Sequence, residues 1–210
     1  MLTLIIGDRN FSSWSLRPWL VLRQAGLAFE ERLVRLDQAG TREAIGRHSP
    51  SGKVPCLIDD EATQCTVVWD SLAICEYLAE RVPVLWPAER TVRAEARSIS
   101  AEMHSGFLAL RQQMPMDLRA RRHGQERGPG LGADIARIAA IWESCRSRFA
   151  ARGPFLFGDF SIADAMYAPV VWRFLTYDVG LPPAAQAWSA TMLALPAMGE
   201  WQAAALAEPR

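Results

Sequence analysis

The chain has 210 residues, of which half are apolar and 22 % are charged, and its 23 basic and 23 acidic residues cancel to a formal net charge of zero. This length suffices for one large domain or two small ones with hydrophobic cores, and the neutral balance argues against binding to nucleic acid or to an anionic membrane. The apolar run at residues 2–6 is too short for a signal peptide, and no run reaches the roughly 20 residues of a membrane span, so we expect a cytoplasmic protein.

Cysteine and histidine spacing gives no sign of a metal site. The cysteines show no C-x-x-C pattern, and the three histidines lie far apart in the chain. In a reducing compartment such cysteines are expected to be free thiols inside the protein. We therefore predict no bound metal and no disulfide among Cys56, Cys65, Cys75 and Cys145.

The first fifty residues predict strands that alternate with helices. Residues 2–6 are a short β-prone apolar run, which indicates a buried strand, and helical periodicity follows at 14–25. Alternating charged and apolar residues at 31–36 are typical of a half-buried strand, and residues 41–47 indicate a short helix.

The stretch from Ser51 to Glu80 predicts a strand hairpin that leads into a helix. A Val-Pro step at residues 54–55 enters one short apolar run, a second β-branched run follows, and an apolar-periodic segment opens at Asp70 and Ser71. Together with the earlier elements this gives the order βαβαββα over about 80 residues. That order is the one found in a thioredoxin-like domain.

Two features of this stretch suit a peptide ligand that carries both an ammonium group and a carboxylate on one carbon, as the end of an α-amino acid does. A helix beginning at Ser71 offers free N–H groups and the positive end of its dipole to a carboxylate, while the Asp70 side chain can accept from an ammonium group. If the Val54–Pro55 bond is cis, the backbone of Val54 is free to pair with an extended peptide; the sequence does not determine the isomer.

Prolines at residues 83 and 87 interrupt the periodicity and indicate a linker at residues 82–90. The predicted domains are thus 1–81, thioredoxin-like, and 91–210, which shows no strand-like run and is expected to be all-α. Helical patterns cover 91–113 and 133–150.

A capping box, which we interpret as structural, precedes the next predicted helix. Ser161 and Asp164 have the i, i+3 spacing of such a box. Residues 184–207 indicate one or two further helices, broken at Pro196.

The paired motifs resemble those of the glutathione S-transferases. Ser-Gly-Lys-Val-Pro-x-Leu, from Ser51, is followed by Asp-Ser-x-Ala-Ile-x-Glu-Tyr-Leu, from Asp70, and in that family a cis-proline loop and an acid-Ser turn hold glutathione. The resemblance implies glutathione as co-substrate, a small hydrophobic electrophile as second substrate, a homodimer, and a role in detoxification. It places glutathione against Lys53, Val54, Asp70 and Ser71.

In the same resemblance the glutathione thiol points to the turn before the first helix. Phe11-Ser12-Ser13-Trp14-Ser15 is similar to the turn of serine-type, zeta-like members, which implies Ser12 as the catalytic residue, with Ser13 second and Asn10 third. A serine hydroxyl can donate to a thiolate, and the helix dipole favours the negative charge. The alternative is that Ser12 or Ser13 only caps the helix, and the two roles are compatible.

The electrophile is expected between this turn and the first helix of the second domain. Trp14, His104 and Phe107 are predicted to line the pocket, with Met103 and Met114 as further candidates. Two alternatives stay open: a zeta-like glutathione-dependent cis-trans isomerase of the maleylacetoacetate isomerase type, and a transferase-like module that mediates protein association without catalysis.

Overall fold

The computed structural model describes residues 1–60, 64–124 and 128–209. Its N-terminal half is built on a four-stranded mixed sheet of order β2-β1-β3-β4. Strand β1 runs parallel to β2 and antiparallel to β3, and β3 pairs antiparallel with β4. The strands are β1 (Leu2–Gly7), β2 (Phe29–Val34), β3 (Cys56–Asp59) and β4 (Thr66–Trp69).

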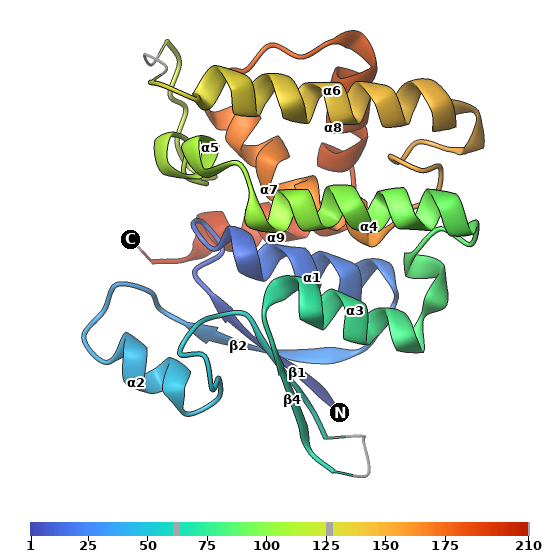
Figure 1. The fold of residues 1–210 in the computed structure, drawn as a ribbon. Coiled ribbons are helices and arrows are strands. Elements are labelled where there is room, and N and C mark those ends of the chain that lie inside the picture. Colours follow the sequence, from blue (N-terminus) through green and yellow to red (C-terminus); the bar gives the residue numbers. More distant parts are fainter. Residues whose placement is uncertain (61–63, 125–127, 210) are drawn as a thin grey trace.

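Two helices separate the sheet from the second domain. Helix α1 (Ser13–Gln24) and helix α3 (Ser71–Arg81) lie side by side between the sheet and helix α4, whereas the short α2 (Thr41–Gly46) lies apart from them beside β2 (Figure 1). Because α1 packs against α3 and against a helix of the second domain, most of its residues are buried. The predicted βαβαββα order is confirmed.

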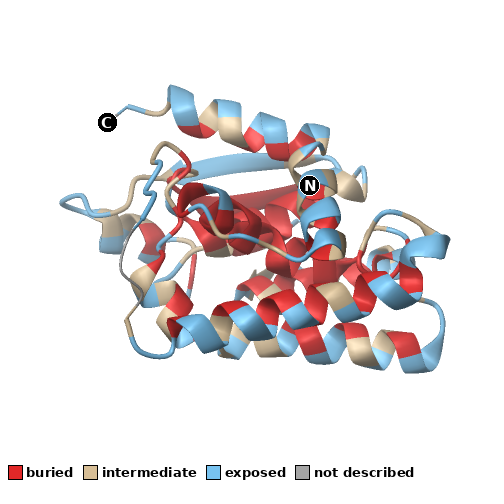
Figure 2. Ribbon diagram, turned by 90° about the horizontal axis from the view of Figure 1, so that it is seen from above, coloured by how far each residue is buried: buried red, intermediate tan, exposed pale blue. Residues whose placement is uncertain are grey.

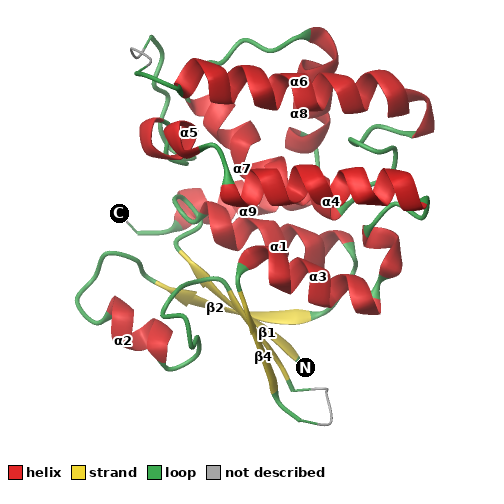
Figure 3. Ribbon diagram, in the orientation of Figure 1, coloured by secondary structure: helices red, strands yellow, loops and turns green. Residues whose placement is uncertain are grey.

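The C-terminal half is helical, as predicted, and in its described part only isolated bridges near residues 155–159 interrupt the helices and loops (Figure 3). Helix α7 is central, since it contacts α1, α4 and α8 and is almost completely buried. The helices are α4 (Arg90–Ser105), α5 (Leu108–Gln113), α6 (Leu131–Phe149), α7 (Ile162–Thr176), α8 (Pro183–Leu193) and α9 (Pro196–Ala207), with single 3₁₀ turns at Pro83–Leu85 and Ala150–Arg152.

One predicted helix was wrong, because residues 91–113 form two helices. The chain breaks at Gly106, which is extended, and at Phe107, which is left-handed with φ 59°. A Cβ at Gly106 would lie 2.8 Å from the Glu102 carbonyl oxygen, so this position favours glycine. Helix α5 then begins afresh, and the Asp134 carboxylate accepts from the Leu110 N–H at 2.9 Å.

The expectation of a half-buried strand at 31–36 also needs correction. The strand occupies Phe29–Val34 and lies at the edge of the sheet, where residues 30–33 are exposed. Its alternating pattern does not mark a buried face. Instead, Glu31 accepts from the indole of Trp19 at 2.8 Å and pairs with Arg9.

Buried residues concentrate where the layers meet, and exposed residues occupy the outward faces of the helices (Figure 2). Asp164, at the start of α7, is fully buried there. Its carboxylate accepts at 2.9 Å from the N–H and hydroxyl of Ser161, the Leu156 N–H and the Trp188 indole. Burial nevertheless raises the Asp164 pKa. The predicted Ser161–Asp164 box is present and anchors three segments of the second domain.

Candidate active site

A pocket of about 430 Å³ lies where the sheet domain meets helix α4. Most of its wall comes from the loop before β3, from the end of β4 and from the start of α3, with one histidine added by α4. It therefore combines residues that are distant in the sequence. The lining residues are Trp14, Ser51, Lys53, Val54, Pro55, Trp69, Asp70, Ser71 and His104.

The Val54–Pro55 peptide bond is cis. Among the described residues, neither the N–H nor the C=O of Val54 has a hydrogen-bond partner, although β3 begins only two residues later. Both backbone groups are thus available to an extended chain entering the pocket. Lys53 stands beside them and supplies a positive charge at the same wall.

The Asp70–Ser71 turn has a backbone that is unusual for a residue with a side chain. Asp70 has φ 76° and ψ 133°, and positive φ in a non-glycine residue is costly and concentrates at binding and catalytic sites. One Asp70 oxygen caps α3 by accepting from the N–H groups of Leu72 and Ala73 at 2.9 and 3.3 Å. The other oxygen lies 3.1 Å from Nε2 of His104.

Ser71, the first residue of α3, presents a buried hydroxyl for which no described residue is a partner. A buried polar group without a partner is costly and points to a ligand or a water that satisfies it. Beside it Asp70 supplies a negative charge. A donor at a helix start and an adjacent carboxylate match the carboxylate and ammonium of one amino-acid end.

The serine turn lies next to this pocket but does not line it. Ser12 begins α1 without a capping hydrogen bond from its side chain, so the capping role considered from the sequence is absent for Ser12. Its hydroxyl instead donates to Ser15 Oγ at 2.7 Å, and the Ser13 hydroxyl accepts from Arg173 at 3.1 Å. Both serines are buried, and Trp14 is the residue of this turn that reaches the pocket.

Asn10 is held by the second domain. Its amide donates to the Asp117 carboxylate at 2.9 Å and accepts from the Arg119 N–H at 3.1 Å. The adjacent Arg9 is fixed as well, because its N–H donates to the Glu208 carboxylate at 3.0 Å and its carbonyl accepts from the indole of Trp201. The turn that carries the serines is thus held in place by contacts with Trp201 and Glu208.

The expected pocket residues of the second domain differ in position. His104 faces the pocket and meets Trp14 edge-on at 5.4 Å between ring centroids, and burial lowers its pKa while Asp70 opposes that effect. Phe107 is buried at the break before α5 and is not part of the wall. Met103 and Met114 are likewise buried outside it.

Three arginines near Trp14, the buried Arg17 and Arg173 and the partly buried Arg111, were not predicted from the sequence. The guanidinium groups of Arg17 and Arg111 lie over the Trp14 ring at 4.4 and 4.7 Å from its centroid, and Arg173 contacts Ser13. Burial and mutual repulsion lower the pKa of Arg17 to about 9 and that of Arg173 to about 10. The available signal was an arginine inside the otherwise apolar run at 16–22.

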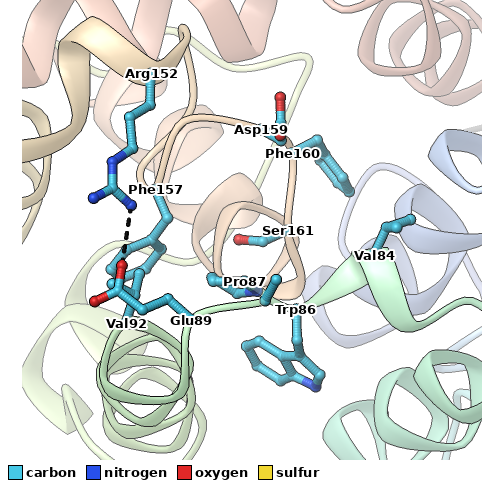
Figure 4. A pocket seen from close by; sticks show the side chains of 11 residues that line it. Val84, Trp86, Pro87, Glu89, Val92, Arg152, Phe157, Asp159, Phe160 and Ser161 are labelled. Carbon is cyan, nitrogen blue, oxygen red and sulfur yellow. Dashed lines mark hydrogen bonds and ion pairs between the residues drawn. The ribbon is translucent and has the colours of Figure 1, made fainter.

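The rest of the described chain contains no other site that includes the predicted functional residues. No group of three or more His, Cys, Asp or Glu residues there could hold a metal ion, and no described helix is long and apolar enough to cross a membrane. A second pocket, of about 350 Å³, lies between the segment before α4 and the loop before α7, with Trp86 and Phe157 in its wall and an ion pair between Arg152 and Glu89 (Figure 4). It shares none of the predicted site residues.

Two family models match most of the chain. The model of the glutathione S-transferase N-terminal domain matches residues 11–81, and that of the C-terminal domain matches residues 104–201. A curated relative, a stringent starvation protein A homologue of Pasteurella multocida, is 26 % identical over 163 residues, which are 73 % of this chain and 66 % of that protein.

Solved structures share the whole fold. A glutathione transferase homologue from Burkholderia GL BGR1, with bound glutathione, is 24 % identical with a TM-score of 0.72, and the match covers 99 % of each chain. An epsilon-class transferase of the housefly is 23 % identical with a TM-score of 0.74, over 98 % of this chain and 94 % of that one. A zeta-class maleyl pyruvate isomerase of bacterial type is 24 % identical with a TM-score of 0.71, over 99 % and 98 %.

Proposed function

This chain belongs to the glutathione S-transferase family, and on that premise we propose that it binds glutathione and transfers its thiolate to a small electrophile. The observation that carries the proposal is that the cis Val54–Pro55 loop and the Asp70–Ser71 turn share one pocket with Trp14. In this proposal the two elements form the two halves of a site for the tripeptide, beside the start of α1.

In this proposal glutathione lies along the wall of the sheet domain. Its backbone pairs with the free N–H and C=O of Val54, and Lys53 attracts a carboxylate. The γ-glutamyl end places its carboxylate at the Ser71 hydroxyl and its ammonium at Asp70. Each interaction satisfies a group that has no other partner or that is charged and faces the pocket.

The sulfur then points toward the turn of Ser12 and Ser13. Ser12 is the preferred activating residue, because its hydroxyl can turn from Ser15 to donate to a thiolate, and α1 begins there without a side-chain cap. Ser13 is the alternative, although its hydroxyl already accepts from Arg173. Asn10 is disfavoured because Asp117 and Arg119 occupy its amide.

Activation of the thiol accounts for little of the rate. Lowering its pKa from about 8.5 to about 6.5 raises the thiolate fraction at pH 7 from roughly 3 % to roughly 75 %, but nucleophilicity falls about eightfold, so the net gain is only about threefold. Positioning of the electrophile against Trp14 and His104 must supply the rest. The sulfur lone pair forms the new bond to carbon, and either a leaving group departs or the adduct takes up a proton.

A second reading is a zeta-like isomerase, in which glutathione adds to a double bond and leaves again after rotation. The fold match to a zeta-class maleyl pyruvate isomerase and the Ser12-Ser13 turn favour it as the alternative. The third alternative is a module that mediates protein association without catalysis, and the similarity to a starvation protein homologue supports it. We favour catalysis, because the Val54–Pro55 loop and the Asp70–Ser71 turn both line the pocket.

Assembly and location are proposals of the same kind. Family membership supports a homodimer, with α3 and α4 at the interface, and gel filtration near 23 kDa would contradict it. The domain boundary at 82–90, the cytoplasmic location and a role in detoxification stay predictions.

Titration calorimetry with glutathione tests the proposed function. We expect binding by the unaltered protein, a large loss of affinity in Ser71→Ala, and a thiolate absorbance when glutathione is added. Conjugation or isomerisation of test substrates then separates transferase from isomerase. Absence of both glutathione binding and thiolate absorbance would overturn the proposed catalytic function and leave the non-catalytic association module as the remaining hypothesis.

A further inference from the structure

The turn that carries Ser12 is closed by its own hydrogen bonds. The backbone N–H groups of Phe11 and Ser12 both donate to the carbonyl of Asp8, at 3.1 and 2.8 Å. The Ser12 hydroxyl donates to Ser15 Oγ at 2.7 Å, on the first turn of α1. Because these bonds tie the residues of the turn to one another, a displacement of Arg9 within it is passed on to Ser12.

Glu208, the residue that follows α9, holds this turn from the far end of the sequence. Its side chain is only 7 % exposed. The two carboxylate oxygens accept from the Arg9 N–H at 3.0 and 3.1 Å, and one of them also accepts from the Arg9 guanidinium at 3.2 Å. Hydrogen bonds to a carboxylate are stronger than those between neutral groups, and a partly buried ion pair is screened little by salt. Glu208 thus fixes both the backbone and the side chain of Arg9.

Arg119 holds Glu208 in place and reaches the same turn. Its guanidinium donates to the Glu208 carbonyl, and its own N–H donates to Asn10 Oδ1 at 3.1 Å. In addition, the indole of Trp201 on α9 donates to the Arg9 carbonyl at 3.0 Å. Two neighbouring residues of the turn are thus bound by the helical domain. Since most of the pocket wall belongs to the sheet domain, these contacts set where the turn lies relative to that wall.

Another ion pair of α9 shows how the Glu208 contact differs from ordinary surface attraction. Glu200 on α9 pairs with Arg23 on α1, and the two side chains are 47 % and 43 % exposed. Exposed pairs of this kind contribute little to stability. Glu208 is shielded from solvent and binds a backbone N–H, so it constrains the position of the turn in addition to attracting a charge.

We propose that Glu208 is a positioning residue for the thiol of glutathione: through Arg9 it fixes the turn that brings Ser12 to the sulfur. The inference rests on the proposed function, because it adds a residue to the same site. Glu208 does not line the pocket, so it acts only through the turn. Without it the Ser12 hydroxyl and the start of α1 are no longer held at a fixed distance from the sulfur, and they stabilise the thiolate less.

The pH at which bound glutathione forms its thiolate tests the proposal. Ultraviolet absorbance of the thiolate, titrated at saturating glutathione, gives a midpoint for each variant. Glu208→Ala should raise this midpoint by about one pH unit, which is half of the shift that activation is proposed to cause. The reaction rate is a less sensitive measure, because the remaining thiolate is more nucleophilic when its pKa is higher.

Two controls separate positioning from a general loosening of the protein. Glu200→Ala removes the exposed pair of α9 and should leave the midpoint unchanged. S-methylglutathione cannot form a thiolate, so its affinity for Glu208→Ala, measured by calorimetry, should stay within about twofold of that for the unaltered protein. Glu208→Gln keeps the side-chain length and one oxygen for the Arg9 N–H. It should raise the midpoint by less than the alanine variant, and it serves if that variant does not fold.

The outcomes separate this inference from the proposed function. An unchanged midpoint in Glu208→Ala, or an equal rise in Glu200→Ala, would overturn the positioning role while the transferase stands. A rise accompanied by a large loss of affinity for S-methylglutathione would show that the pocket wall itself is damaged, which would also overturn that role. Absence of thiolate absorbance in the unaltered protein would overturn activation by Ser12 and the positioning role together.

Discussion

Replacing Arg17 by methionine should make the protein more stable, although a large buried side chain is being changed. Burial and two neighbouring arginines lower the Arg17 pKa from 12.5 to about 9. At about 1.36 kcal/mol per pH unit, this shift corresponds to a cost of roughly 5 kcal/mol for keeping the charge inside the fold. Methionine has a similar length, is apolar and adapts to irregular spaces.

The gain is reduced by the contact with Trp14. A desolvated cation–π pair contributes about 2 kcal/mol, which the variant loses. We therefore expect the free energy of unfolding to rise by about 3 kcal/mol. Because the folded pKa lies below the unfolded value, the folded state binds fewer protons between pH 9 and 12.5, so the cost is relieved only above pH 9 and is fully present at pH 7.5.

Urea unfolding at pH 7.5 measures the change, with an unchanged m-value as the sign that the denatured state is the same. Arg173→Met is the matched control, since Arg173 is also buried but donates to the Ser13 hydroxyl and the Met114 carbonyl, and its loss should destabilise the protein. If Arg17→Met lost 2 kcal/mol or more at constant m, Arg17 would be a structural anchor, and the reasoning about its Nε and Nη1 atoms, which have no hydrogen-bond partner among the described residues, would be refuted.

Three further predictions concern acidic groups and the histidine. Asp70→Asn keeps the side-chain oxygen that caps α3 but loses the negative charge, so the free energy of unfolding should change by less than about 1 kcal/mol. The affinity for glutathione, measured by calorimetry, should fall at least tenfold. An unchanged affinity would show that Asp70 does not bind glutathione. The NMR titration midpoint of His104 should lie below its usual value of 6.5 and fall further in Asp70→Asn, because burial lowers this pKa and Asp70 raises it; a rise in the variant would contradict the pairing. Asp164→Ala leaves four donors unsatisfied in the core and should cost about 3 kcal/mol or more in urea unfolding, whereas a loss below 1 kcal/mol would show that water replaces the carboxylate.

Local chemistry explains which parts of the fold could be predicted. Strand and helix periodicity, the Val54–Pro55 step and the Asp70–Ser71 turn depend on neighbours in the sequence, and these elements lie where the pattern indicated. The break at Gly106 was missed because a single glycine within an apolar-periodic run is compatible with a continuous helix. In the structure Asp134, a distant residue on α6, accepts from the Leu110 N–H in the first turn of the new helix.

The candidate site was harder to predict where it depends on contacts across the domains. Lys53, Val54, Asp70 and Ser71 share a pocket, as their motif suggested. The orientation of Ser12 and Ser13 could not be read from the turn, because Ser15 and Arg173 determine it. Arg17 belongs to no recognised sequence motif, and its electrostatic environment depends on two arginines from α5 and α7.

The contact between Glu208 and Arg9 determines how late the turn before α1 can be fixed during translation. Glu208, 199 residues further along, holds the N–H of Arg9, and Arg119 donates to the Glu208 carbonyl while its own N–H holds Asn10. The ribosome makes the turn before α1 well before it makes Arg119, and Glu208 follows later still. The pocket wall formed by residues 51–71 is therefore complete on the nascent chain well before the contacts that hold the turn of Ser12 and Ser13 can form.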